Sequence, residues 1–193
     1  ASLGCSMSDN KTENFKVQVD RFADIEILRY QVPGFENLNL RQKKFVYYLS
    51  KAALSGRDII YDQNYKHNLT IRKIINNIVT DYTGNKESQA WMQFMDYAKR
   101  VWFSNGIHHH YSTLKILPEF DRSYLSKLIT NTNETFPLND GENIDEFIQR
   151  MTPIIFDPQI DAKRVNLDPE DDIISSSANN YYDGVSQDEV EKF

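Results

Sequence analysis

The chain has 193 residues, of which 40% are hydrophobic and 26% charged, and its formal net charge is −6. This length suffices for one sizeable hydrophobic core and is short for two domains, so we expect one globular fold. The acidic balance and the lack of a basic patch argue against a nucleic-acid-binding protein. No run of 18 or more apolar residues occurs, so the sequence predicts no membrane-spanning helix.

The first five residues read ASLGC, and Cys5 is the only cysteine. Small residues before a lone cysteine resemble the end of a bacterial lipoprotein signal peptide, in which the cysteine is lipidated and becomes the mature N-terminus. We therefore expect residues 1–15 to be a leader and flexible tether that anchors the protein on the periplasmic side of the cell envelope through Cys5. Ser2 stands where a large apolar residue is usual, so a disordered leader on a cytoplasmic protein is the alternative.

Apolar and polar residues alternate over residues 23–32, which predicts a short strand or extended segment that ends at Pro33-Gly34. Asn39 is a suitable N-cap for a helix that Gly56 would stop. The apolar residues of that helix mark one face, which we expect to lie against the core: Leu40, Val46, Leu49, Ala52 and Ala53. Residues 57–66 predict only a turn of helix and a loop.

Asn68 is a second candidate N-cap, before a helix with isoleucines at three- and four-residue spacing that stops at residues 83–85. A third long helix carries a broad apolar face from Trp91 to Trp102. Further helices are expected to start within residues 120–123 and to span residues 143–151, the latter ended by Thr152-Pro153. Residues 154–156 then predict a buried extended segment.

The remaining segments, residues 130–142, 168–172 and 175–184, predict loops. Ser186 and Glu189 spell a capping box only a few residues before Phe193. A helix that begins so near the last residue leads us to expect that the natural protein continues. Together the segments of residues 16–193 predict a mainly α fold with a few short strands or extended segments.

Residues 101–118, VWFSNGIHHHYSTLKILP, contain the strongest candidate for a functional centre. A helical, aromatic-rich pattern breaks at Asn105-Gly106, and three histidines and Tyr111 follow directly. Because proteins commonly present binding groups on an irregular loop held by a rigid scaffold, we interpret this loop as functional.

Three adjacent histidines, His108, His109 and His110, raise the possibility of a metal site. Adjacent side chains project in different directions, so we favour structural or substrate-lining histidines and assign no metal ligand. No G-x-S-x-G elbow and no glycine-rich nucleotide loop occurs, and no spacing singles out an acid/base pair, so we assign no catalytic residue.

Three stretches carry a resemblance to a known family: residues 22–64, residues 100–112 (RVWFSNGIHHHYS) and the late KRVN…SSSANNYYDGVSQDEVEKF. They resemble the N-terminal part of Bacteroides-type bacterial members of the dipeptidyl peptidase III family, in the same order over nearly all of residues 22–193. The resemblance includes irregular loops as well as helix faces.

Members of that family are two-lobed zinc exopeptidases that remove dipeptides from the N-termini of short peptides. The resemblance implies that residues 16–193 are the opening portion of the lower, non-zinc lobe. The zinc motif H-E-x-x-G-H is absent here, so this chain would bind no zinc itself and would be inactive alone. The implied partners are short peptides and the zinc lobe of the same polypeptide.

Carried over by position, the loop of residues 105–112 would face the substrate cleft, with Tyr111 as an aromatic contact to substrate side chains. His110 and Asn105 are possible hydrogen-bond partners for a peptide backbone. Residues 179–182 form a second candidate patch that includes Asn180 and Tyr181, although core packing is an equal alternative for the two tyrosines.

An alternative function belongs to another class: a non-catalytic envelope lipoprotein or helical interaction module. A reading frame that continues past Phe193 into H-E-x-x-G-H would favour the peptidase, and a stop codon there would favour the module.

Overall fold

The computed structural model describes residues 15–193, which divide into two compact units, residues up to 38 and residues 39–193. Helices dominate the described part, and its named strands form one two-stranded sheet. The predicted mainly α fold with a few short strands is therefore confirmed.

In the first unit, β1 (Gln18–Phe22) and β2 (Ile25–Leu28) form an antiparallel hairpin. Phe22 and Ile25 flank the two-residue turn and are both buried. The predicted extended segment over residues 23–32 is confirmed for β2, whereas β1 was not predicted. The short 3-10 helix η1 (Phe35–Asn37) follows Gly34.

The second unit begins with α1 (Leu40–Ser55), capped as predicted by Asn39. The Asn39 Oδ1 accepts from the Gln42 amide at 2.9 Å, and the Gln42 side chain accepts from the Asn39 amide at 2.9 Å. However, no residue of α1 is buried, so the expectation that its apolar side faces a core is wrong for this chain. Periodicity determines which residues share a face, but burial also requires a neighbouring element.

The next helix, α2 (Arg57–Asn64), begins directly after Gly56. Gly56 keeps a right-handed backbone, with φ of −83°, so it does not form the left-handed cap that ends many helices. The prediction of a single helical turn and a loop over residues 57–66 is therefore wrong. Burial of Tyr61 stabilises this short helix.

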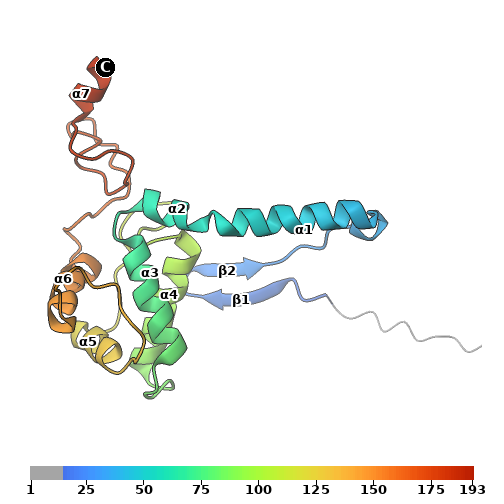
Figure 1. The fold of residues 1–193 in the computed structure, drawn as a ribbon, viewed down its shortest axis with the longest axis horizontal. Coiled ribbons are helices and arrows are strands. Elements are labelled where there is room, and N and C mark those ends of the chain that lie inside the picture. Colours follow the sequence, from blue (N-terminus) through green and yellow to red (C-terminus); the bar gives the residue numbers. More distant parts are fainter. Residues whose placement is uncertain (1–14) are drawn as a thin grey trace, which may run out of the picture. The chain divides into compact units, whose positions relative to one another are not determined.

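Two long helices follow as predicted, α3 (Asn68–Asp81) and α4 (Gln89–Ser104), and they lie side by side (Figure 1). Ser88 caps α4 by accepting from the Trp91 amide at 3.2 Å. Asp121 caps α5 (Arg122–Thr130), which packs against α6 (Ile144–Phe156). The last helix, α7 (Gln187–Lys192), has the predicted capping box between Ser186 and Glu189.

Helix α6 passes through Pro153, so the predicted helix end at Thr152-Pro153 and the extended segment over residues 154–156 are both wrong. An internal proline costs a helix about 3 kcal/mol or more, because it removes a hydrogen bond and crowds the preceding turn. Burial of Ile155 beside Met151 offsets part of this cost, since burying one such side chain is worth roughly 1.5–3 kcal/mol.

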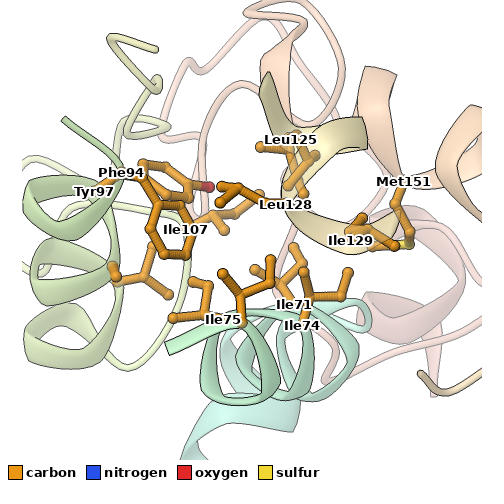
Figure 2. Packing of buried hydrophobic residues seen from close by; sticks show 14 of the residues in the cluster. Ile71, Ile74, Ile75, Phe94, Tyr97, Ile107, Leu125, Leu128, Ile129 and Met151 are labelled. Carbon is orange, nitrogen blue, oxygen red and sulfur yellow. The ribbon is translucent and has the colours of Figure 1, made fainter. Parts of the chain in front are cut away.

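The hydrophobic core of the second unit lies among α3, α4, α5 and α6, with Ile107 contributed by the loop after α4 (Figure 2). Isoleucines of α3 face Phe94 and Tyr97 of α4 on one side and leucines of α5 on the other. This packing fixes both ends of the histidine-containing loop, because α4 precedes it and α5 follows it.

Candidate functional site

The loop after α4 starts with a sharp helix end at Asn105 and Gly106, as the sequence predicts. Asn105 is left-handed, with φ of 51°, and the Gly106 amide donates to the Val101 carbonyl at 3.0 Å. A Cβ at Gly106 would lie 2.1 Å from Nδ2 of Asn68, and its φ is +147°. Glycine is therefore required where the chain turns into the loop.

Two asparagines hold the start of this loop against α2 and α3. The Asn68 Oδ1 accepts from the Ile107 amide at 3.1 Å, and its Nδ2 donates to the Tyr61 carbonyl at 3.0 Å. Asn64 donates to the Asn105 carbonyl at 3.1 Å. The prediction that Asn68 caps α3 is wrong, because it is the first residue of α3 and its buried side chain binds the loop instead.

Beyond Gly106 the chain forms a small ladder of extended segments. His108 bridges Lys115, and Leu114 bridges Lys163, both antiparallel. A fourth segment joins when the Ala178 amide donates to the Lys163 carbonyl at 3.0 Å. The ladder thus brings residues 107–116 next to residues 162–165 and 178–179, although they lie far apart in the sequence.

The three adjacent histidines have three different environments. His108 is buried, and its Nε2 lies 2.7 Å from the Asp161 carbonyl oxygen. Because that contact needs a donor, Nε2 carries the proton, and Nδ1 remains buried without a hydrogen-bond partner. Burial lowers the pKa of His108, and the hydrogen bond to Asp161 only partly opposes this shift.

The second histidine closes the tip of the loop. The His109 Nδ1 accepts from the backbone amides of Tyr111 at 3.2 Å and Ser112 at 3.1 Å. His110 is exposed, and its ring contacts that of Phe103 edge-on, with centroids 4.9 Å apart. The side chain of Tyr111 is 88% exposed, so the loop holds this ring in solvent from a tip fixed by hydrogen bonds.

His67, remote in sequence, lies near His108, because the Tyr65 ring contacts both imidazoles edge-on, with centroids 5.1 and 5.3 Å apart. The Tyr65 hydroxyl donates to the Asp161 carboxylate at 2.5 Å. Nevertheless, residues 15–193 contain no group of three or more His, Cys, Asp or Glu side chains placed to hold a metal ion.

Arg164 connects the two candidate patches. Its Nη1 donates to Asn64 Oδ1 at 3.3 Å, and its Nη2 lies 3.5 Å from the His110 carbonyl oxygen. The Arg164 carbonyl accepts from both the backbone and the side-chain amide of Asn179, at 3.1 and 3.2 Å. The loop of residues 105–112 and the patch of residues 179–182 therefore lie on either side of one arginine.

Lys115 fixes the far side of the ladder to the end of α6. Its Nζ donates to the carbonyls of Ile154 at 3.1 Å and Asp157 at 2.9 Å, and also to that of Ile160. Burial lowers the pKa of Lys115, which the nearby Asp161 and Asp157 oppose. A cation at the C-terminal end of a helix also complements the helix dipole.

The site residues predicted from the sequence thus have different settings. Tyr111, His110 and Tyr181 are exposed, Tyr181 by 61%. Asn180 is half-buried, and its amide donates to the Gln63 carbonyl at 2.9 Å. Asn105 serves as a helix end, and its carbonyl accepts from Asn64. The alternative of core packing for Tyr181 and Tyr182 is wrong, since Tyr182 is 52% exposed.

Sequence reasoning missed Arg164 and Asn64. No local pattern marks either residue, because their contact joins positions 100 apart in the chain. Cys5, the predicted lipidation site, lies outside the described residues. Among the described residues, no helix is long and apolar enough to cross a membrane.

A search of protein-family models finds no match to this chain, and a search of curated proteins finds none either.

Proposed function

We propose that residues 105–112 and 179–182 are part of a surface that binds short peptides. The observation that supports this proposal is that two exposed tyrosines, Tyr111 and Tyr181, belong to segments that contact the same arginine, Arg164. An exposed aromatic ring offers a large apolar face to a ligand side chain. His110 and Asn180 add polar groups for a peptide backbone.

We further propose that the complete protein is a zinc-dependent dipeptidyl peptidase of the dipeptidyl peptidase III type, with this chain as the N-terminal part of its non-zinc lobe. A bound zinc ion would activate water for peptide hydrolysis. The ligands for that ion are proposed to lie outside residues 1–193, so the residues described here would bind and orient the substrate.

The test uses the complete polypeptide read from the same gene and a dipeptidyl-arylamide substrate. Tyr111→Ala should lower kcat/KM about tenfold, which corresponds to roughly 1.4 kcal/mol of lost contact energy. Tyr111→Phe should stay close to wild type, because the ring makes the contact. Tyr30→Ala removes a tyrosine that is 79% exposed in the first unit and is the matched control.

An unchanged rate for Tyr111→Ala would remove this residue from the substrate surface. If the complete protein releases no dipeptide, or if a chelator leaves the release unaffected, the peptidase proposal is wrong.

One observation favours the second candidate, a helical interaction module. Helix α1 exposes large apolar side chains around its circumference: Leu40, Phe45, Val46, Tyr47, Tyr48, Leu49 and Leu54. Apolar surface of this kind marks an interaction site in many soluble proteins. A stop codon directly after Phe193, together with the lack of peptidase activity, would support this candidate.

For the location of the protein we propose a lipid anchor at Cys5 on the periplasmic side of the cell envelope. Metabolic labelling with a radioactive fatty acid in a bacterial host should mark the precursor with its complete N-terminus and should fail for Cys5→Ser. Labelling that persists in Cys5→Ser would disprove the anchor.

A further inference from the structure

Arg164 is a half-buried cation, and not all N–H donors of its guanidinium have an acceptor in the described residues. A guanidinium carries five N–H donors in a fixed fork. The structure gives this one two long contacts, 3.3 Å to Asn64 Oδ1 and 3.5 Å to the His110 carbonyl oxygen. Neither acceptor is charged, so the positive charge is not neutralised by these contacts.

Within residues 15–193, no carboxylate lies within ion-pair distance of Arg164. The other half-buried arginines with carboxylate partners provide the contrast, since Arg150 pairs with Glu142 at 2.6 Å and Arg72 pairs with Asp58. The nearest candidate acid along the chain, Asp161, accepts from the Tyr65 hydroxyl. In a chain of net charge −6, an unpaired arginine inside a fold is unexpected.

The guanidinium of Arg164 lies beside the proposed peptide-binding surface. The carbonyl that Arg164 contacts belongs to His110, the residue directly before Tyr111. On its other side, its own carbonyl binds Asn179, next to Asn180. A ligand that lies against the Tyr111 ring would therefore have a planar, bidentate cation close by, and such a fork matches the geometry of a carboxylate.

We infer that Arg164 binds the C-terminal carboxylate of a short peptide that lies along Tyr111. This inference rests on the proposed peptide-binding surface and names its substrate class: peptides short enough for a free C-terminus to reach Arg164. A longer chain or a C-terminal amide lacks the anion and loses this contact.

The experiment follows the backbone amides and the arginine Nε–H groups of the 193-residue chain by nuclear magnetic resonance. The two probes are tetra-alanine and its C-terminal amide, which share one N-terminus. The free acid should shift the signals of Arg164 and Tyr111 and bind at least about tenfold tighter than the amide, because only the acid offers the guanidinium a charged hydrogen-bond partner.

Arg164→Gln should abolish the preference for the free acid, and Arg164→Lys, which keeps the charge and loses the fork, should retain part of it. Arg57→Gln removes an exposed arginine of α2 and is the matched control. A purely structural role would weaken both peptides equally in Arg164→Gln, and that result would overturn the inference.

Equal affinity of the wild-type chain for the acid and the amide would also overturn the inference while leaving the peptide-binding surface in place. Binding of neither peptide would overturn both.

Discussion

At the scale of single residues, Gly106 allows the chain to turn sharply from the end of α4 into the histidine loop. The place where another residue would carry its Cβ is occupied by the side chain of Asn68. Asn68 in turn accepts a hydrogen bond from the Ile107 amide. The same asparagine contacts the Tyr61 carbonyl in α2. One glycine and one asparagine thus join α2, α3 and the loop.

Gly106→Ala should therefore destabilise the protein by about 2–4 kcal/mol, because the new Cβ would collide with Asn68 and the φ of +147° is unfavourable for alanine. Urea denaturation followed by circular dichroism measures the loss. Gly141→Ala is the comparison, since a Cβ there meets nothing within 4 Å although its φ is also positive, at 78°. Equal losses in both variants would show that contact with Asn68 is unimportant.

A second prediction at this scale concerns the buried histidine. Burial lowers the pKa of His108 below its ordinary value of about 6.5, so the unfolded chain binds a proton more readily than the folded chain as the pH falls. The protein therefore keeps its full stability above about pH 6.5. Below that pH its free energy of unfolding falls by up to about 1.4 kcal/mol per pH unit. His67, whose pKa burial also lowers, adds to this loss.

His108→Gln should be less stable than wild type at pH 8 but should lose less stability between pH 7.5 and 5.5. Urea midpoints measured across this range test the prediction. An identical pH dependence in the two proteins would mean that His108 does not titrate on unfolding.

At the scale of secondary-structure elements, α1 and α4 have the same length but differ in burial. Both span 16 residues and begin at a capped N-terminus, but α4 buries six residues and α1 buries none. Capping and periodicity alone do not distinguish them. The difference is that α3 packs against α4, while no core residue of the cluster comes from α1.

This contrast predicts very different costs for removing large side chains. Leu49→Ala in α1 should change the free energy of unfolding by less than about 0.5 kcal/mol, because the side chain is 53% exposed and alanine suits a helix. Phe94→Ala in α4 should cost about 3–5 kcal/mol, because it leaves a cavity in the core. Urea denaturation of the 193-residue chain compares the two, and a core-sized loss for Leu49→Ala would contradict the assignment of α1.

At the scale of the whole molecule, the described residues form two units of unequal size. The large hydrophobic cluster draws all its members from residues 65–178, and the buried residues of the first unit, Phe22 and Ile25, do not belong to it. A two-stranded hairpin on its own is only marginally stable in water. The second unit therefore contains the cooperative core.

A chain of residues 39–193 should accordingly unfold within about 2 °C of the 193-residue chain, since a difference of 1 kcal/mol would shift Tm by roughly 2–4 °C. Amides of β1 and β2 in the longer chain should exchange with solvent faster than those of α3 and α4. Differential scanning calorimetry and hydrogen exchange measure these outcomes. A fall of ten degrees or more on truncation would show that the first unit stabilises the core.

The sequence by itself determined the local features. Asn39 and Ser186 cap helices as predicted, because a cap needs only partners two or three residues away. The helix end at Asn105-Gly106 depends equally on local backbone geometry. The mainly α fold follows from such signals, whereas the choice of Tyr111 came from the family resemblance and its exposure from the structure.

Only the tertiary structure decided which surfaces are covered and which distant residues meet. It left α1 exposed, carried α6 through Pro153 and turned the side chain of Asn68 toward the loop. It also placed Arg164 beside Asn64 and the carbonyl of His110. The physical reason is that these outcomes depend on contacts between segments tens of residues apart, whose free energies outweigh local preferences and leave no pattern in neighbouring positions.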